Sequence, residues 1–271
     1  MDQQNNLNDI AEENLLNFAN IVHNLMLTQE KIDNKENYDF NTDNLDKKKL
    51  YIINKIININ MAVRNIIHND CVYVKKSLIH GNGVFAKYNI KKNSIITIYP
   101  IDSIYYTNNL EEKNLYFLEK NFFDCINNKN YMIGINKDIE IYGNQNNISN
   151  NTVIGHIIND SVSFTIDNEN IDDISLKNII CKYVLTSNNN AIMKSNPDKT
   201  LYYIIATKDI NEGDEILMSY QPKYWLDNKK LYKRFETFLI NDIKFKQFFL
   251  NIGFQKLCGS SNNTEILQYL S

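Results

Sequence analysis

The sequence predicts an α+β fold, in which a β-rich middle region lies between helical segments at the two ends. Apolar residues recur at helical spacing in the first 70 residues and again from residue 226 onward. Between these ends, short runs of β-branched residues alternate with Gly, Asn and Asp turns, which is typical of strands. We therefore expect three segments: helical residues 1–70, a β-rich domain over 71–225, and helical residues 226–271.

Two helices are expected within the first 70 residues. Apolar side chains between residues 9 and 28 repeat every three or four positions, and a polar stretch from Asp33 to Asp43 follows them. Asp43 or Asn44 is a suitable N-cap for a second helix that runs to about Ile67. Its apolar face is predicted to contain Leu50, Ile53, Ile57 and Met61. Stripes of this kind are more often packing surfaces than functional sites.

The remaining elements are predicted from periodicity and turn residues. The expected strands are Cys71–Val74, Ile95–Tyr99, Tyr131–Ile135, Ile139–Tyr142, Leu201–Ala206 and Glu215–Tyr220, and the expected helices are 110–123 and 170–185. The 170–185 helix is expected to turn Ile171, Ile174, Ile179, Tyr183 and Val184 inward. The helical segment from Asp227 to Phe254 is expected to bury Leu231, Phe235, Phe238, Leu239, Ile243 and Phe249.

Composition and charge exclude several classes of protein. A hydrophobic content of 43% is enough for a real core. The net charge of −3 argues against direct nucleic-acid binding, because phosphate contacts need clustered Lys and Arg. The four cysteines are far apart and form no Cys-x-x-Cys pair, so we expect neither a metal site nor a disulfide framework.

The chain also lacks the usual signs of membrane insertion. It begins Met1-Asp2-Gln3-Gln4, which is polar and acidic and unlike a signal peptide. The most apolar stretch, residues 50–63, is interrupted by Asn and Lys and is too short to cross a bilayer. We expect a soluble intracellular protein without a membrane partner, and the sequence does not choose between nucleus and cytoplasm.

A glycine-rich motif at residues 81–86 has two interpretations. Gly81-Asn82-Gly83-Val84-Phe85-Ala86 fits the G-x-G-x-x-A pattern of a dinucleotide-binding loop, but that loop needs a helix directly after the glycines. Turn-prone residues follow here instead, in a strand-rich region. The motif therefore indicates a tight turn at which missing side chains let a ligand reach the backbone.

Two further segments carry candidate functional residues. Asn159-Asp160-Ser161 ends an apolar run that starts at Val153, and by itself it is typical of a strand that ends in an Asx-type turn. His156, within that run, is more typical of a hydrogen-bonded structural histidine than of a ligand or base. The stretch from Ala206 to Tyr220 indicates a hairpin whose last strand delivers a tyrosine at its end.

In this order, the three segments resemble the SET domain of protein lysine methyltransferases. Ser77 to Ala86 is similar to that family's opening segment, and His156 to Ser161 is similar to its Arg-Phe-Ile-Asn-His-Ser segment. Asn188 to Ala191 resembles the Pro-Asn pair that follows, and Ala206 to Tyr220 resembles the Ala-x-x-x-Ile-x-x-Gly-x-Glu-Leu-x-x-x-Tyr ending. The resemblance implies a β-clip with pseudoknot-like threading over residues 71–225, with a helical insertion at 162–187.

The resemblance implies methyl transfer from S-adenosylmethionine to a lysine of a protein substrate, for which histones are one choice. Tyr220 would lie beside the sulfonium and the lysine nitrogen as the catalytic residue. A neutral amine is needed, and burial beside a sulfonium lowers the lysine pKa, so no general base is assigned. The implied cofactor-binding residues are Gly81, Asn82 and Gly83 through their backbone, Asn159 through its side chain, Asp160 through its backbone, and Tyr220 and Trp225.

Three residues are implied for the lysine channel: Tyr99, Tyr142 and Met218. Met218 stands where relatives carry the Phe or Tyr that sets the number of methyl groups, so we expect that more than one can be added. No metal ligand is implied, since the cysteine-rich segments of many relatives are absent. Tyr224, Trp225 and the carboxy-terminal helix are expected to close the channel instead.

The sequence departs from the family pattern in ways that leave a second function open. Asp160 replaces the family's His, His156 replaces its Arg, and residues 162–187 lengthen the gap before Asn188. The alternative is a SET-like interaction module that has lost catalysis. A purely structural β-rich protein is a third reading, and it predicts no binding of S-adenosylmethionine.

Overall fold

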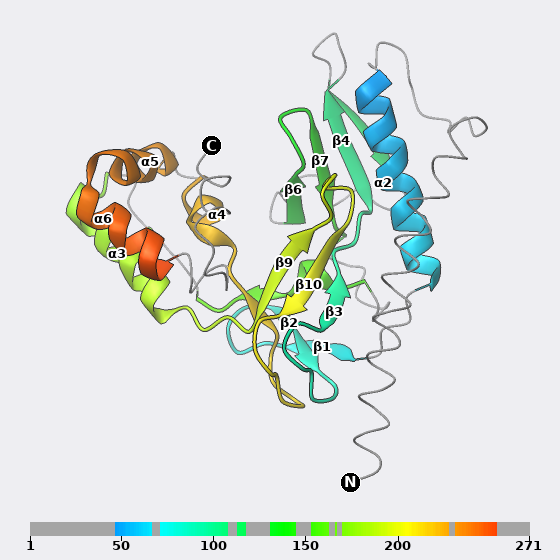
Figure 1. Ribbon diagram of the computed structural model, residues 1–271, viewed down its shortest axis with the longest axis horizontal. Helices are drawn as coiled ribbons and strands as arrows, with labels where there is room; N and C mark the ends of the chain where they lie inside the picture. The colour runs from blue at the N-terminus through cyan, green and yellow to red at the C-terminus, as the bar shows by residue number, and fades with distance from the viewer. Residues whose placement is uncertain are drawn as a thin grey trace. The chain divides into compact units, whose positions relative to one another are not determined.

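A computed structural model describes residues 47–66, 71–107, 113–117, 131–144, 153–162, 166, 170–227 and 231–253 (Figure 1). The chain folds into two compact units, each built from separated parts of the sequence. Unit 1 comprises Met1–Val72, Ser94–Ile157 and Lys194–Ile205, and unit 2 comprises Tyr73–Asn93, Ile158–Met193 and Ala206–Ser271. The predicted segment limits at residues 70 and 225 stay predictions.

Unit 1 contains an antiparallel sheet of order β5-β4-β7-β6 (Figure 1). Its strands are β4 (Ser103–Thr107), β5 (Lys113–Phe117), β6 (Met132–Gly134) and β7 (Ile139–Tyr142). The predicted strand pair around Asn136-Lys137 is therefore confirmed. The predicted helix over 110–123 is wrong at residues 113–117, which pair with β4 along its whole length, and the rest of that range lies outside the described residues. A neighbouring strand offers this segment backbone hydrogen bonds that outweigh weak helix propensity.

A second sheet has the order β3-β10-β9, with strands β3 (Ile95–Ile98), β9 (Ala191–Ser195) and β10 (Tyr202–Ala206). In unit 1, β10 runs antiparallel to β3, with Tyr203 opposite Ile98 and a register shift between Ile204 and Ile205. Ile98 packs in an apolar cluster with Ile59 and Leu201. The strands expected at 95–99 and 201–206 are confirmed to within one residue.

Helix α2 (Lys47–Ile66) packs in unit 1 through one face, and the side chains of its residues 49–61 are described. Ile53, Ile56 and Ile57 are buried, and buried Asn60 pairs with the backbone of Ile101: its amide donates to the carbonyl at 2.7 Å and accepts from the N–H at 3.2 Å. The expectation that Met61 faces inward is wrong, since it is 49% exposed. Asn60 occupies the buried position, and the next residue lies about 100° further around the helix.

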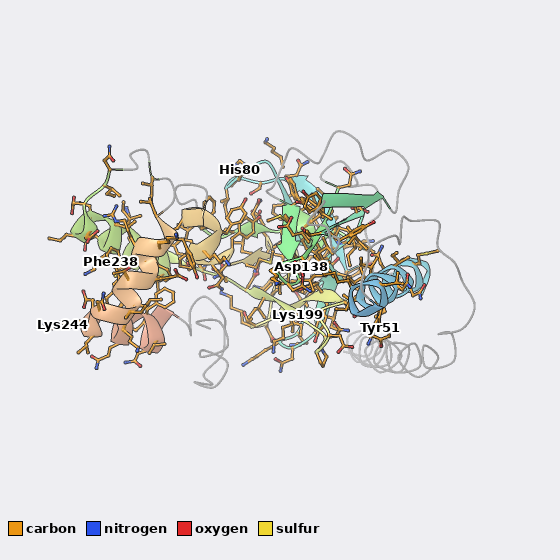
Figure 2. All side chains as sticks on the ribbon, turned by 90° about the horizontal axis from the view of Figure 1, so that it is seen from above. Tyr51, His80, Asp138, Lys199, Phe238 and Lys244 are labelled. Carbon is orange, nitrogen blue, oxygen red and sulfur yellow. The ribbon has the colours of Figure 1, made fainter. Side chains whose placement is uncertain are left out.

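Other parts of the amino-terminal prediction lie outside the described residues. These are the first helix of the expected hairpin, over 9–28, and the candidate caps Asp43 and Asn44. Tyr51, on α2, is 49% exposed (Figure 2).

Short strands carry the sequence motifs of unit 2. Strand β1 (Val72–Lys76) pairs with β2 (Asn82–Ala86). The G-x-G motif thus opens a strand, which agrees with the rejection of a dinucleotide-binding loop. Strand β8 (Asn159–Asp160) runs parallel to β11 (Leu217–Met218). The strand expected over 215–220 is shorter than predicted, and Gln221, with a φ of +71°, begins α4 (Gln221–Asp227) directly after Tyr220.

The apolar run from Val153 forms a 3₁₀ turn, η3 (Gly155–Ile157), in unit 1 rather than a strand. Only the two residues that follow this run, Asn159 and Asp160, are extended, and they form β8. The Asx-type turn is present in unit 2: the Asp160 side chain accepts from the Val162 N–H at 3.2 Å.

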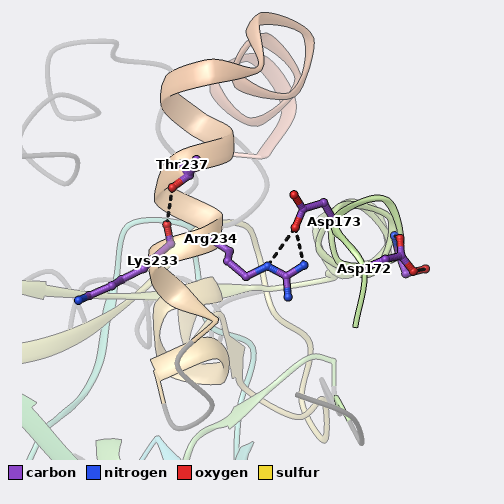
Figure 3. Close-up of polar contacts among 6 residues, drawn as sticks. Asp172, Asp173, Lys233, Arg234 and Thr237 are labelled. Carbon is purple, nitrogen blue, oxygen red and sulfur yellow. Dashed lines mark hydrogen bonds and ion pairs between the residues drawn. The ribbon is translucent and has the colours of Figure 1, made fainter. Parts of the chain in front are cut away.

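The helices α3 (Asp173–Thr186), α5 (Tyr232–Asn241), α6 (Ile243–Phe248) and the π-helical turn η4 (Phe249–Gly253) enclose the apolar core of unit 2 (Figure 1). Asp172 caps α3 by accepting from the Ser175 N–H at 2.9 Å. On the surface, the Arg234 guanidinium of α5 pairs with Asp173 of α3 (Figure 3). The core residues are Ile166, Leu176, Ile180, Tyr183, Val184, Leu226, Leu231, Phe235, Phe238, Leu239, Phe245 and Phe249.

Two residues expected in this core are exposed. Ile174 is 73% exposed, because α3 buries the face of Leu176 and Ile180 instead. Ile243 is 71% exposed, because Asp242 ends α5 and caps a new helix, so the apolar periodicity restarts and Phe245 is buried in its place.

The pairing of Asn60 with Ile101 gives a stability prediction. Asn60→Ala removes both hydrogen bonds to buried backbone groups and should lower the free energy of unfolding by about 1–3 kcal/mol. Met61→Ala, at the neighbouring exposed position, should change it by less than about 0.5 kcal/mol. Urea unfolding of both variants measures the difference, and equal effects would contradict the role of Asn60.

Candidate functional site

The Asn159 side chain lies against the G-x-G turn within unit 2. Its Nδ2 donates to the carbonyls of His80 at 2.9 Å and Asn82 at 3.0 Å, and lies 3.1 Å from Glu215 Oε1. Three acceptors around one atom fix the amide orientation, because an oxygen in that place would be repelled by all three. Among the described residues none donates to Asn159 Oδ1, so this oxygen can accept a hydrogen bond from a ligand.

The turn that presents these carbonyls depends on Gly81 and Ser77. Gly81 has a φ of +49°, in the left-handed region that favours glycine. The Ser77 N–H donates to the Gly81 carbonyl at 3.0 Å, and Ser77 Oγ accepts from the Ile79 N–H at 2.9 Å. His80 lies at the exposed part of this turn (Figure 2). The turn therefore places two backbone carbonyls beside Asn159.

Gly83 makes room for the Glu215 carboxylate. A Cβ at residue 83 would lie 2.9 Å from Glu215 Cδ and 3.1 Å from Ser77 Cβ, and closer still to Glu215 Oε1. The other carboxylate oxygen of Glu215 accepts from Ser77 Oγ at 3.0 Å. The absence of a side chain at residue 83 thus lets Glu215 reach both Ser77 and Asn159.

Asp160 forms a hydrogen-bonded centre next to Asn159. Its Oδ2 accepts from Tyr183 Oη at 2.5 Å, the Tyr220 N–H at 2.9 Å and Trp225 Nε1 at 3.0 Å, and Oδ1 accepts from the Val162 N–H. The side chain is buried. Desolvation raises the pKa of Asp160 above its usual value, although these hydrogen bonds, that of Tyr183 first, act in the opposite direction.

Tyr220 is held by both its hydroxyl and its ring. The hydroxyl donates to the Ile158 carbonyl at 2.7 Å. The ring stacks on Trp225 with centroids 6.0 Å apart, and Tyr224 packs edge-on against both, at 4.8 Å and 5.2 Å. All three aromatic residues are half-buried. Helix α4 supplies Tyr224 and Trp225, so the sharp turn at Gln221 brings these rings back onto Tyr220.

Asn190 joins the segments that carry these groups. Its side chain donates to the Glu215 carbonyl at 2.8 Å and accepts from the Leu217 N–H at 2.8 Å, while its own N–H donates to the Leu217 carbonyl at 3.0 Å. Leu217 is in turn the parallel partner of Asn159 in the β8–β11 pair. Asn190 thereby fixes the strand that leads to Tyr220 beside the Asn159-Asp160 segment.

The structure brings most of the predicted site residues together. Unit 2 holds Gly81, Asn82, Gly83, Asn159, Asp160, Met218, Tyr220 and Trp225. Met218 is buried and lies opposite Asp160 in the β8–β11 pair. Tyr99 and Tyr142 belong to unit 1, so their place in a lysine channel stays a prediction.

The hydroxyls of the two unit 1 tyrosines have partners there. Tyr99 Oη donates to the Tyr131 carbonyl at 2.6 Å, and Tyr142 Oη lies 3.1 Å from Glu140 Oε2. Burial and the nearby Glu140 raise the pKa of Tyr142. His156 is buried with Nε2 2.8 Å from the Asn144 carbonyl, in agreement with a structural histidine.

Three contributors to the site were missed as functional residues. Glu215 belongs to the Gly-x-Glu part of the third motif, so the sequence held a signal for it. Asn190 lies in the Asn188–Ala191 segment that resembles the family's Pro-Asn pair, and Tyr183 is expected from the sequence only as an inward residue of the 170–185 helix. In the described residues no group of His, Cys, Asp or Glu could hold a metal ion, and no described helix is long and apolar enough to cross a membrane.

Comparison with known proteins assigns the family. The SET domain model matches residues 81–221 of the 271, just over half of the chain. The chain belongs to the SET-domain family. The resemblance read from its motifs is confirmed, as is an α+β, β-rich SET fold with helical flanks.

Matches to solved structures add no detail about activity. They include a Plasmodium falciparum protein named as a "putative histone methyltransferase", which is 22% identical, with a TM-score of 0.31. The match covers 57% of this chain and 96% of that one. Because that TM-score is low, the family assignment depends on the SET domain model. No curated protein matches the chain.

The close approach at Gly83 gives a second stability prediction. Gly83→Ala adds a methyl group where Glu215 and Ser77 already lie, and overpacking of this kind costs about 1–3 kcal/mol. Gly134→Ala, where an added Cβ meets no atom within 4 Å, is the matched control and should leave stability within about 0.5 kcal/mol. Urea unfolding compares them, and a tolerated Gly83→Ala would contradict the packing of Glu215.

The pKa of Asp160 gives a prediction about pH. Because the folded-state pKa is raised, burying the ionised carboxylate costs stability at neutral pH. This loss is absent below the unfolded pKa of about 3.9 and develops as the pH rises through the folded pKa. Tyr183, the titratable group facing Asp160, stays protonated because its own pKa is raised.

Urea unfolding of the wild type and Asp160→Asn between pH 4 and pH 7 measures this effect. The free energy of unfolding of the wild type, relative to the variant, should increase as the pH falls. A relative increase as the pH rises would mean that the hydrogen bonds to Asp160 outweigh its desolvation.

Proposed function

We propose that this SET-domain protein transfers a methyl group from S-adenosylmethionine to a lysine side chain of a protein, with Tyr220 beside the reacting atoms. The observation that carries the proposal is the meeting of the G-x-G turn, Asn159 and Tyr220 in unit 2. These are the residues that the family resemblance assigns to the cofactor and to the reacting centre. The proposal names only a class of substrate, namely proteins that carry an accessible lysine, and histones belong to this class.

The turn and Asn159 fit the amino-acid end of S-adenosylmethionine. An α-ammonium group is a hydrogen-bond donor with a positive charge, and Asn159 Oδ1 is an acceptor to which no described residue donates. The carbonyls of His80 and Asn82 lie close to the same side chain. The Glu215 carboxylate nearby adds a negative charge that favours a cation here.

The aromatic residues around Tyr220 fit the other requirements of the reaction. When bound, S-adenosylmethionine supplies a methyl group on a positively charged sulfur, and aromatic faces attract cations. We assign the Asp160 backbone to the adenine edge and Trp225 to the cofactor, as the resemblance implies. Trp225 and Tyr224 pack against the Tyr220 ring and cover part of it.

Tyr220 has the hydrogen bonding that a methyl-transfer site needs. Its hydroxyl proton is donated to the Ile158 carbonyl, so toward a polarised methyl group the phenolic oxygen would act as the acceptor of a weak C–H···O contact. The Ile158 carbonyl holds this oxygen in place. The oxygen then orients the substrate amine and does not remove its proton. The lysine loses its proton before the reaction, because burial beside a sulfonium lowers its pKa from about 10.4.

The alternative function is a protein-interaction module that has a SET-like fold but does not transfer methyl groups. It is motivated by Asp160, which stands where the family carries His and whose carboxylate bonds to groups inside the protein. This side chain does not, however, remove the acceptor of Asn159 or the tyrosine at residue 220. The enzyme is therefore the better-supported function.

Transfer of labelled methyl groups to histones and to a protein lysate tests the proposal. Tyr220→Phe should lower the rate about 100-fold or more, since positioned polar groups at reacting centres contribute on this scale. It should still bind S-adenosylmethionine in a thermal-shift assay. Tyr88→Phe, at an exposed tyrosine of unit 2, is the control and should keep full activity.

The outcomes separate the candidate functions. Cofactor binding without transfer that depends on Tyr220 would favour the binding module. The absence of any thermal shift with S-adenosylmethionine would favour a structural protein. Asn159→Ala should lose the shift while the protein stays folded, because it loses the acceptor for the ammonium group.

Product analysis tests the role of Met218. A thioether holds no ordered water as a tyrosine hydroxyl would, so the wild type should add more than one methyl group to a lysine. Met218→Tyr should reduce this number. Mass spectrometry after long incubation measures it, and only monomethylated product from the wild type would contradict the expectation.

A further inference from the structure

A directed chain of hydrogen bonds runs through Asp160 to both sides of Tyr220. An ionised carboxylate only accepts, so Tyr183 must give its single proton to Asp160 Oδ2 at 2.5 Å. The Tyr183 oxygen then accepts from the Ser219 hydroxyl at 2.9 Å, and Ser219 Oγ accepts from the Gln221 N–H at 3.0 Å. The same Asp160 oxygen accepts the Tyr220 N–H. The directions of these hydrogen bonds are therefore consistent with one another.

The chain of hydrogen bonds starts from the helical insertion. Tyr183 lies on α3, within residues 162–187, which the family motifs do not include. It is 1% exposed and packs with Ile180 and Val184 in the helical core of unit 2. A phenylalanine would fill this apolar position, so packing alone does not explain the hydroxyl or the buried carboxylate that it meets.

The groups at the other end all surround the proposed reacting centre. Asp160 holds the peptide N–H of Tyr220 and the indole N–H of Trp225, which stacks on the Tyr220 ring. Ser219 holds the N–H of Gln221, a residue with a φ of +71°, where the chain leaves β11 and enters α4. A non-glycine residue in this conformation persists only where surrounding bonds fix it.

We propose that Asp160 and Tyr183 are positioning residues, which hold the Tyr220 backbone and the Trp225 indole in the geometry that methyl transfer needs. This inference depends on the proposed function. It gives one residue of the insertion, Tyr183, a part in the geometry of the site. It also gives the replacement of the family's His by Asp a purpose: a carboxylate accepts three donors at one oxygen, which a histidine nitrogen cannot do.

Kinetics of Tyr183→Phe and Asp160→Asn test the inference. Each variant keeps the shape of the side chain and loses part of the hydrogen-bond chain. For each, kcat should fall about tenfold to a hundredfold, with a smaller change in the KM for the protein substrate, because small misplacements at a reacting centre act on this scale. The kcat of the double variant should be only slightly below that of the less active single variant, since the two residues act as one unit.

The matched control is Ile180→Val, which trims a buried residue of the same helix. It should lower the stability of the helical core without lowering kcat. A fall in kcat for Ile180→Val as large as that for Tyr183→Phe would mean that any disturbance of α3 reduces activity, and it would overturn the positioning role.

A fluorescence signature separates this inference from the proposed function. Trp225 is the only tryptophan of the chain, so its emission reports on the indole that Asp160 holds. Acrylamide quenching of folded Tyr183→Phe and Asp160→Asn should rise above that of the wild type, while Ile180→Val should match the wild type. If Asp160→Asn fails to fold by circular dichroism, Tyr183→Phe, which loses only a hydroxyl, decides.

The two proposals fail in different ways. No transfer by the wild type to any substrate refutes the proposed function, and with it the catalytic purpose assigned here. Transfer by the wild type with unchanged kcat in both variants overturns the positioning role alone, whether or not the quenching of Trp225 changes. Reduced kcat with increased quenching in Tyr183→Phe, and neither in Ile180→Val, supports it.

Discussion

The arrangement of the site depends on one buried carboxylate. Asp160 Oδ2 accepts hydrogen bonds from α3 through Tyr183, from the end of β11 through the Tyr220 N–H, and from α4 through Trp225. Helix α3 and Asp160 itself are distant in the sequence from the adjoining segments β11 and α4. A buried carboxylate must be surrounded by donors, and desolvation still raises its pKa, so the protein keeps a group that is costly to bury. Such a cost is expected where a side chain serves the geometry of a site more than the stability of a fold.

Asn159, the residue before Asp160, is held by a different set of contacts. Two carbonyls of the G-x-G turn and the Glu215 carboxylate accept from Asn159 Nδ2 and so fix the orientation of its amide. Gly83 allows this because a side chain there would occupy the place of the Glu215 carboxylate. The second glycine of the motif thus acts through packing, while Gly81 acts through its positive φ. A short motif that fits a dinucleotide-binding loop in sequence therefore serves another purpose here, because a strand follows it rather than a helix.

Errors in the predicted elements have physical causes that the sequence does not display. Residues 113–117 have no strong preference, and pairing with β4 makes them a strand. Met61 and Ile174 are apolar and lie near helical stripes, but each is exposed because its neighbours occupy the buried face. Ile243 follows a break at Asp242 that restarts the helical phase. In each case the residue types are local information, whereas the buried face or the pairing partner is set by the tertiary structure.

By itself, the sequence determined the order of three motifs, the family that they indicate, and the residues Asn159 and Tyr220 as centres of interest. It could do so because turn glycines, an amide after an apolar run and a tyrosine at a strand end are local features with local causes. Only the tertiary structure decided that Glu215 orients Asn159, and that Tyr183 of the insertion reaches Asp160. These contacts join residues 56 and 23 positions apart. Their hydrogen-bond partners are set by how the segments pack, which no local pattern of residues encodes.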